Sequence, residues 1–451
     1  MERNTNKGSL KVLVTNRQIL SIALPITFAI LIPQLNMLVN AIFLGQLSRE
    51  ALGNAGITGV FYLIFAVAGH GINSSMQSVF SGYAGKDQPE KFKTAFAQGI
   101  IISLSFSLIF ILFTWFIAPL ILSKIAGAAN FPEEMSFLKV RIFGLPFLYL
   151  FQIGNAFLIA SLNTRLLLIG FVFEALVNIV FDYLLIFGKF GFPAMGFNGA
   201  AFASIIAECS GMLVVFAVIS ISGLKQKFKL LEDFRFDKTI SKKIMKIAIP
   251  LVLQFIISLS TWLVFFLLIE DKGANAKAIS NTMRNVFGLA GIFIWAFAGT
   301  SNTMVANLIG QQRENMVIPV VKKISFWSIG LCSLIILILN IFPEAFFQLF
   351  GQSKDFSDEG IPVIRVVSLG LIFMSVSNIW LNAVTGTGKT KINLLIEIAA
   401  IVLYLIYTWY FMKWHYISLA VAWSNEFIYW STIFTIAYFY IKSGKWKSQK
   451  D

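Results

Sequence analysis

Charge is scarce in this 451-residue chain: Asp, Glu, Lys and Arg make up 13% of it, whereas hydrophobic residues make up 57%. Soluble domains contain about 25% charged residues. A soluble chain so poor in charge could not cover its surface with polar groups, whereas a lipid bilayer tolerates an apolar surface. The composition therefore excludes an ordinary soluble enzyme and indicates an integral membrane protein.

Cysteine is equally scarce. The two cysteines, Cys209 and Cys332, lie in separate apolar stretches. Two isolated thiols form neither a disulfide framework nor the spacing of a structural metal site. We therefore expect neither a disulfide nor a metal at these thiols. For the chain as a whole, an integral membrane protein, we expect no cofactor and no enzymatic activity.

Apolar runs of membrane-spanning length recur along the whole chain. A transmembrane helix needs about 20 mostly apolar residues, and strands of a membrane barrel would instead alternate apolar with polar over about ten residues. These runs do not alternate, so we predict an all-α polytopic protein with twelve transmembrane helices. The predicted spans are about 17–44, 52–84, 93–122, 136–162, 166–188, 197–222, 244–269, 278–310, 317–347, 361–386, 392–412 and 416–441.

The net charge of +14 could indicate nucleic-acid binding, but the distribution of basic residues gives a better explanation. Twelve spans place 25 of the 36 Lys and Arg on the side that holds both termini, and 11 on the other side. Basic residues concentrate on the cytoplasmic side of membrane proteins. We therefore predict a multi-pass plasma-membrane protein, or an inner-membrane protein in a Gram-negative cell, with both termini cytoplasmic, surrounded by lipids and without a nucleic-acid partner.

The sequence repeats itself at an offset of 225 to 226 residues. QILSIALPI at 18–26 aligns with KKIMKIAIPL at 242–251, which pairs Pro25 with Pro250. Six spans per half give parallel repeats, an arrangement in which transporters place a site between two lobes. We predict an N-terminal lobe at 1–222, a cytoplasmic linker at 223–243 and a C-terminal lobe at 244–451. Proline bends helices, so Pro25 and Pro250 are hinge candidates.

Ionisable side chains at membrane depth are costly and are functional candidates. Glu174, Asn178 and Asp182 are spaced i, i+4, i+8 and share one helix face. Asn36 and Asn40 have the same i, i+4 spacing in the first span. If the first, fifth and sixth spans are adjacent, these oxygens converge on a site for Na⁺ or a proton. The other interpretation is a polar cluster that only locks helices together.

Further polar residues lie within other predicted spans. Ser204 and Glu208 are one turn apart in the sixth span. The other candidates for polar residues in the transport cavity are Asn155, Gln254 and Glu397. Glu426 in the last span is a weaker candidate.

The segment AVTGTGKT at 383–390 nearly matches the phosphate-binding loop G-x-x-x-x-G-K-[ST], but Ala383 replaces the first glycine. The genuine motif also follows a strand in a soluble α/β domain, which this sequence lacks. We predict that these glycines only separate two spans and that the protein binds no ATP, which excludes an ATP-driven pump.

The order of several motifs resembles the multidrug and toxic compound extrusion (MATE) family over nearly the whole chain. These motifs are IALPI at 22–26, NAIFLG at 40–45, GINSSMQSVFSGYAGKDQPEK at 71–91, NIVFDYLLIFG at 178–188, GFNGAAFASIIAE at 196–208 and GTGKT at 386–390. The resemblance implies a two-lobed monomeric antiporter that exports small organic, often cationic, compounds in exchange for Na⁺ or H⁺.

The family's cation site, carried over by these motifs, falls on Asn40, Asn178, Asp182 and Ser204. Asp182 and Asn178 would be the Na⁺ ligands. The chain departs from the family pattern at Asn40, where the family usually has Asp, and this change removes one negative charge from the site. A flippase for lipid-linked precursors is the alternative, although a pyrophosphate group would require a cationic cavity.

Overall fold

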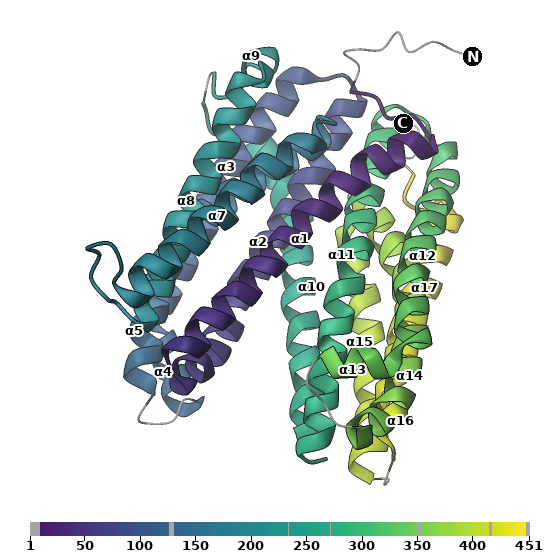
Figure 1. The fold of residues 1–451 in the computed structure, drawn as a ribbon. Coiled ribbons are helices and arrows are strands. Elements are labelled where there is room, and N and C mark those ends of the chain that lie inside the picture. Colours follow the sequence, from purple (N-terminus) through teal and green to yellow (C-terminus); the bar gives the residue numbers. More distant parts are fainter. Residues whose placement is uncertain are drawn as a thin grey trace. The chain divides into compact units, whose positions relative to one another are not determined.

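The protein is described here by a computed structural model that covers residues 10–125, 130–232, 234–270, 272–349, 354–414 and 417–447. Every regular element within these ranges is a helix (Figure 1). The first half contains α1 (Asn16–Leu47), α2 (Arg49–Gly85), α3 (Pro89–Phe116), α4 (Ala118–Ile125), α5 (Phe131–Arg141), η1 (Ile142–Gly144), α6 (Leu145–Ala160), η2 (Thr164–Leu166), α7 (Leu167–Phe187), α8 (Phe197–Ile221) and α9 (Leu224–Lys227). The second half contains α10 (Lys238–Glu270), α11 (Ala274–Gly310), η3 (Glu314–Met316), α12 (Val317–Ile341), α13 (Pro343–Leu349), α14 (Lys354–Gly386), α15 (Thr390–Trp414), α16 (Leu419–Trp423) and α17 (Asn425–Ser443).

The predicted all-α membrane fold is confirmed. The described residues contain 11 helices long and apolar enough to cross a bilayer, and α16 with α17 covers the twelfth predicted stretch. Large apolar side chains are exposed along these helices; Phe116 is 72% exposed and Phe326 is 71% exposed. Lipid is the solvent that makes such surfaces stable.

The two halves repeat each other helix by helix. Helices α2 and α11 both have 37 residues, and their first and last residues are 225 positions apart. The turns that follow these helices also match, because Asp87 and Gln312, again 225 positions apart, both have positive φ angles of 56° and 60°. The repeat seen in the sequence is thus a repeat of backbone geometry.

Two predicted spans are too long. The third was expected to reach residue 122, but α3 ends at Phe116 and α4 starts at Ala118. The ninth was expected to reach 347, but α12 ends at Ile341 and α13 starts at Pro343. The apolar composition continues through both breaks, and Pro119 and Pro343 are found where the short helices begin. Proline is favoured in the first turn of a new helix, because it lacks the N–H that would be unpaired there.

The segment that resembles a phosphate-binding loop is a turn between two spans, as predicted. Helix α14 ends at Gly386 and α15 begins at Thr390. Gly388 between them has a φ of +74°, a conformation that glycine adopts without steric cost.

The helices pack into two compact units. The first unit comprises Leu24–Val252 with the described residues before Val12, and the second comprises Val12–Ala23 and Leu253 onward. Helices α1 and α10 therefore each contribute residues to both units. These boundaries differ from the predicted ones, which ended the N-terminal lobe at residue 222 and started the C-terminal lobe at residue 244. The predicted lobes follow the sequence repeat and remain a prediction. Residues 238–243, assigned to the linker, already belong to α10.

Each unit has its own apolar core. In the first unit, one cluster joins α1, α7 and α8 through Leu44, Ile186 and Ala201. In the second, a larger cluster is formed around Phe265, Met283 and Trp423. The first of these clusters confirms that the first, fifth and sixth spans are neighbours, which is the condition for a shared polar site.

Candidate functional site

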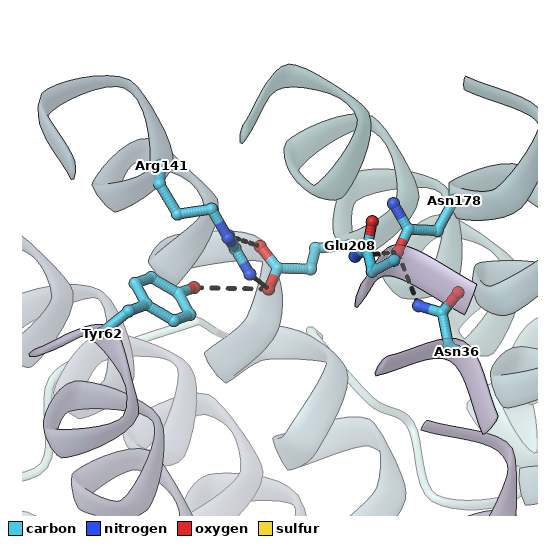
Figure 2. Close-up of polar contacts among 6 residues, drawn as sticks. Asn36, Tyr62, Arg141, Asn178 and Glu208 are labelled. Atoms are coloured by element: carbon cyan, nitrogen blue, oxygen red, sulfur yellow. Dashed lines mark hydrogen bonds and ion pairs between the residues drawn. The ribbon is translucent and has the colours of Figure 1, made fainter. Parts of the chain in front are cut away.

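The candidate cation site lies in the first unit, where α1 faces α7. Asp182 is 0% exposed and Asn178 is 3% exposed. Asn36 Nδ2 donates a hydrogen bond to Asn178 Oδ1 at 2.5 Å (Figure 2). The i, i+4 spacing places Asn178 and Asp182 on the face of α7 that meets α1, as the sequence predicted.

Asn40 links the two α7 residues through either orientation of its amide group. In one orientation its nitrogen is 3.5 Å from Asn178 Oδ1. In the other, which satisfies the hydrogen-bonding groups better, the nitrogen donates to Asp182 Oδ1 at 3.2 Å and to Oδ2 at 2.6 Å. The orientation of an amide is assigned from its hydrogen bonds. Asn40 therefore caps the carboxylate of Asp182.

Three amides and one carboxylate suit a site for a small cation. Within the described residues, no basic side chain forms an ion pair with Asp182. Asn36 Oδ1 is buried without a hydrogen-bond partner there, so an amide oxygen remains available. Na⁺ requires several oxygen ligands, whereas a proton requires only the carboxylate.

The remaining candidates of the first unit are not hydrogen-bonded to this cluster. Ser204 is half-buried on α8, and Asn155 on α6 is 5% exposed with its Oδ1 unpartnered among the described residues. Glu174 is one turn before Asn178 on α7 and packs against Gly211 of α8.

Glu208 is not an open carboxylate of the cation site, because Arg141 neutralises it. Arg141 Nη1 donates to Glu208 Oε2 at 2.8 Å and Nη2 donates to Oε1 at 2.5 Å (Figure 2). Tyr62 of α2 donates a further hydrogen bond to Oε1 at 3.3 Å, and its ring lies 3.9 Å from the guanidinium carbon. The side chains of Arg141 and Glu208 are only 12% and 6% exposed.

The partner of Glu208 is Arg141, a residue that the sequence alone did not single out. Arg141 is a charged residue inside an apolar span, which is a signal that the sequence carries. Its partner is 67 residues away on α8. Only the packing of α5 against α8 brings the two together.

In the second unit, the structure brings together two predicted residues, Gln254 of α10 and Glu397 of α15. Gln254 Nε2 donates to Glu397 Oε2 at 3.3 Å, and the Tyr429 hydroxyl of α17 donates to Oε1. Glu426 of α17 accepts a hydrogen bond from Trp430 Nε1 at 2.9 Å. Pro25 and Pro250 lie inside α1 and α10, each within three residues of the point where the helix passes from one unit to the other.

The two repeated halves of membrane-spanning helices and the buried acidic site indicate a polytopic transporter. The family model MatE matches this chain twice, at residues 25–184 and 250–410, and the two matches begin 225 positions apart. The chain therefore belongs to the MATE family, which is a family of transporters rather than enzymes.

Curated relatives are distant but similar in length. The chain is 22% identical over 446 residues to the probable multidrug resistance protein NorM of Thermotoga maritima, covering 96% of this chain and 93% of the relative. It is 22% identical over 393 residues to the protein of the same description from Synechocystis, covering 84% of each.

Solved structures share the fold. A MOP superfamily transporter from Pyrococcus furiosus, whose binding pocket is described as having reverse polarity, superimposes with a TM-score of 0.86 at 16% identity over 98% of both chains. An outward-facing multidrug resistance MATE family transporter gives a TM-score of 0.86 at 17% identity over 96% of both chains.

Proposed function

We propose that this protein is a secondary active antiporter that exports small organic, often cationic, compounds from the cytoplasm in exchange for Na⁺ or H⁺. The single observation that carries the proposal is Asp182, a fully buried carboxylate capped by the amide of Asn40, one turn from Asn178, and without an ion-pair partner among the described residues. The names of the curated relatives support a multidrug substrate range.

Asp182 is the charge-carrying group in this proposal. An ionised carboxylate costs roughly 2.5–3.5 kcal/mol at the centre of a span by insertion scales, and this is an upper bound for Asp182, which lies five residues before the end of α7. A bound cation or a proton offsets that cost. Asn40 can turn its amide oxygen toward Na⁺ or its nitrogen toward the bare carboxylate, since an amide has both groups, and Asn36 and Asn178 can add amide oxygens to the cation. The site therefore accommodates both a loaded and an empty state.

A lipid-linked precursor is the weaker substrate class. A pyrophosphate group would require cationic partners, whereas the first unit presents Asp182 and Glu174, and its Arg141 is occupied by Glu208. No curated relative described above carries a flippase name.

The test is efflux of a fluorescent organic cation from proteoliposomes under separately imposed Na⁺ and H⁺ gradients. We expect one gradient to drive transport by the wild type and Asp182→Asn to abolish it, with insertion into the membrane unchanged. Glu50→Gln, which removes an exposed acid at the start of α2, is the matched control and should transport normally. Wild-type transport by Asp182→Asn would falsify the assignment of Asp182.

A further inference from the structure

The second unit contains two buried carboxylates that lack a cationic partner. Glu397 is 1% exposed and Glu426 is 3% exposed. Neither forms an ion pair within the described ranges, in contrast to Glu208 of the first unit. Their hydrogen-bond partners among the described residues are neutral: Tyr429, Gln254 and Ser258 for Glu397, and Trp430 and Trp262 for Glu426.

The hydrogen bonds around Glu397 connect three helices. The carboxyl group is on α15, the Tyr429 hydroxyl comes from α17, and the Gln254 amide comes from α10. Ser258, one turn after Gln254 on α10, is 3.1 Å from the same Tyr429 hydroxyl. Glu397 is therefore the centre of a buried polar network whose α10 members are Gln254 and Ser258.

Every member of this network can reverse its hydrogen bond. Gln254 donates through Nε2, while its Oε1 is buried and has no partner among the described residues. If the amide turns, Oε1 accepts a hydrogen bond from a protonated Glu397. Either hydroxyl of the Tyr429 and Ser258 pair can be the donor. The same side chains can therefore donate hydrogen bonds to Glu397 as a carboxylate and accept one from it as a carboxylic acid. A residue that stays permanently charged would need only donors.

The groups that contact Glu397 are neutral. On α17 the Tyr429 hydroxyl donates to it, whereas Glu426, three residues earlier, is hydrogen-bonded to Trp430. On α15 itself, the ring of Tyr404 lies 5.8 Å from that of Tyr429, and Lys391, six residues before Glu397, is exposed. Helix α16 has no titratable side chain, and Arg365 of α14 is exposed. Because no basic side chain among the described residues pairs with Glu397, a proton is the simplest means of neutralising it at this depth.

We propose that Glu397 is a second proton-exchange site, located in the second unit, and that Gln254 and Ser258 transmit its protonation state to α10. Glu397 takes a proton from water to form the carboxylic acid and returns it to water on deprotonation. Gln254 is two residues beyond Val252, the last residue that α10 contributes to the first unit. The site itself is independent of Asp182, whereas its role in transport rests on the proposed function.

Infrared difference spectroscopy of the reconstituted protein tests the site without requiring transport. The difference between high and low pH should contain a carboxylic-acid C=O band that disappears in Glu397→Gln. Tyr429→Phe should keep the band but change its frequency, because the acid loses a hydrogen-bond partner. Glu426→Gln, the other buried acid of this unit, is the control and should leave this component in place.

Three results would overturn the proposal: no band loss in Glu397→Gln, loss of the same component in Glu426→Gln, or disappearance of the band when Na⁺ is added at fixed pH. The last result would identify a cation site rather than a proton site. Tyr429→Phe keeps the carboxyl group, so its frequency shift still tests the assignment if Glu397→Gln does not fold.

Transport measurements then test the coupling. The ratio of the highest to the lowest efflux rate over the same pH range should be at least tenfold smaller in Glu397→Gln than in the wild type. Binding of the organic substrate should be retained. An unchanged pH profile would refute the role in coupling. If the wild type shows no efflux under either gradient, the proposed function fails, and the infrared result still decides whether Glu397 exchanges a proton.

Discussion

Arg141 and Glu208 form a two-point ion pair inside the first unit, with Nη1 and Oε2 2.8 Å apart and Nη2 and Oε1 2.5 Å apart. The pair joins α5 to α8 in the unit that also contains Asp182. Removal of one partner of a buried ion pair destabilises a protein by roughly 3–5 kcal/mol, because the other charge is left uncompensated.

We therefore predict that Arg141→Leu and Glu208→Leu each lower the thermal unfolding temperature of the purified transporter, and that the double variant recovers most of the loss. If the double variant lowers the unfolding temperature by the sum of the two single effects, the two residues act independently. The measurement is thermal unfolding in detergent or nanodiscs.

Gly144 is the second test of the ion pair. A Cβ atom at this position would overlap Glu208 Oε2 and Arg141 Nη1. Gly144→Ala should therefore displace the pair and lower the unfolding temperature, but by less than Arg141→Leu, because the ends of the two side chains can shift and stay paired. Gly330→Ala is the control, because no atom lies within 4 Å of its added Cβ. Gly330→Ala should leave the free energy of unfolding unchanged or raise it by up to about 1 kcal/mol, because alanine favours a helix more than glycine. Equal effects of the two substitutions would contradict the packing argument.

The sequence predicted most of the fold because lipid imposes a simple rule. Each span must satisfy its own backbone hydrogen bonds and must be long and apolar, so the runs themselves reveal the helices. The two breaks after Phe116 and Ile341 were missed because the residues across them remain apolar. The repeat was visible because the first spans of the two halves share residues such as Pro25 and Pro250. The equivalent turns at Asp87 and Gln312 could not be found this way, because different residues adopt the same backbone conformation there.

The candidate site was predictable only in part. The spacing of Asn178 and Asp182 fixed their common helix face, and Asn36 and Asn40 followed from the same periodicity. The pairing of Arg141 with Glu208 was not predictable, because two residues 67 positions apart meet only through tertiary packing. Ser204 remains a prediction: it lies on α8 as expected, and within the described structure its hydroxyl is not hydrogen-bonded to the cluster.

The predicted topology requires a labelling experiment. The distribution of basic residues predicts that both termini are cytoplasmic. In a variant with Cys209→Ala and Cys332→Ala, single cysteines at Lys11 and Ser443 should react with an impermeant reagent only after the membrane is opened. A cysteine at Lys189, in the predicted outer loop between α7 and α8, is the positive control and should react in intact cells. Labelling of the two terminal positions from outside would reverse the topology.

Pro25 and Pro250 are found where α1 and α10 pass from one unit to the other. Proline removes a helix hydrogen bond and permits bending. We predict that Pro25→Ala and Pro250→Ala slow turnover severalfold while affinity for the organic substrate is retained. Pro33→Ala, also inside α1 but distant from the boundary, should have a smaller effect. An equal effect of Pro33→Ala would indicate general helix stiffening rather than a hinge.

The motifs that resemble the MATE family imply an acidic residue where this chain has Asn40. Its amide nitrogen caps both oxygens of Asp182. Asn40→Asp replaces that donor with a second carboxylate at hydrogen-bond distance. Two carboxylates so close cannot both remain ionised without a cation or a shared proton. We therefore predict at least tenfold tighter binding of the coupling cation and slower turnover, because release now leaves two charges in contact.

The control for this substitution is Asn36→Asp, since Asn36 bonds to Asn178 rather than to Asp182. It adds the same charge one turn away and should change cation affinity less. The measurement is cation binding by calorimetry and efflux from proteoliposomes, each as a function of Na⁺ and pH. If Asn40→Asp leaves both unchanged, then Asn40 does not face the coupling ion. If Asn36→Asp has the larger effect, the ion is held near Asn178, because the added charge is most effective closest to the cation.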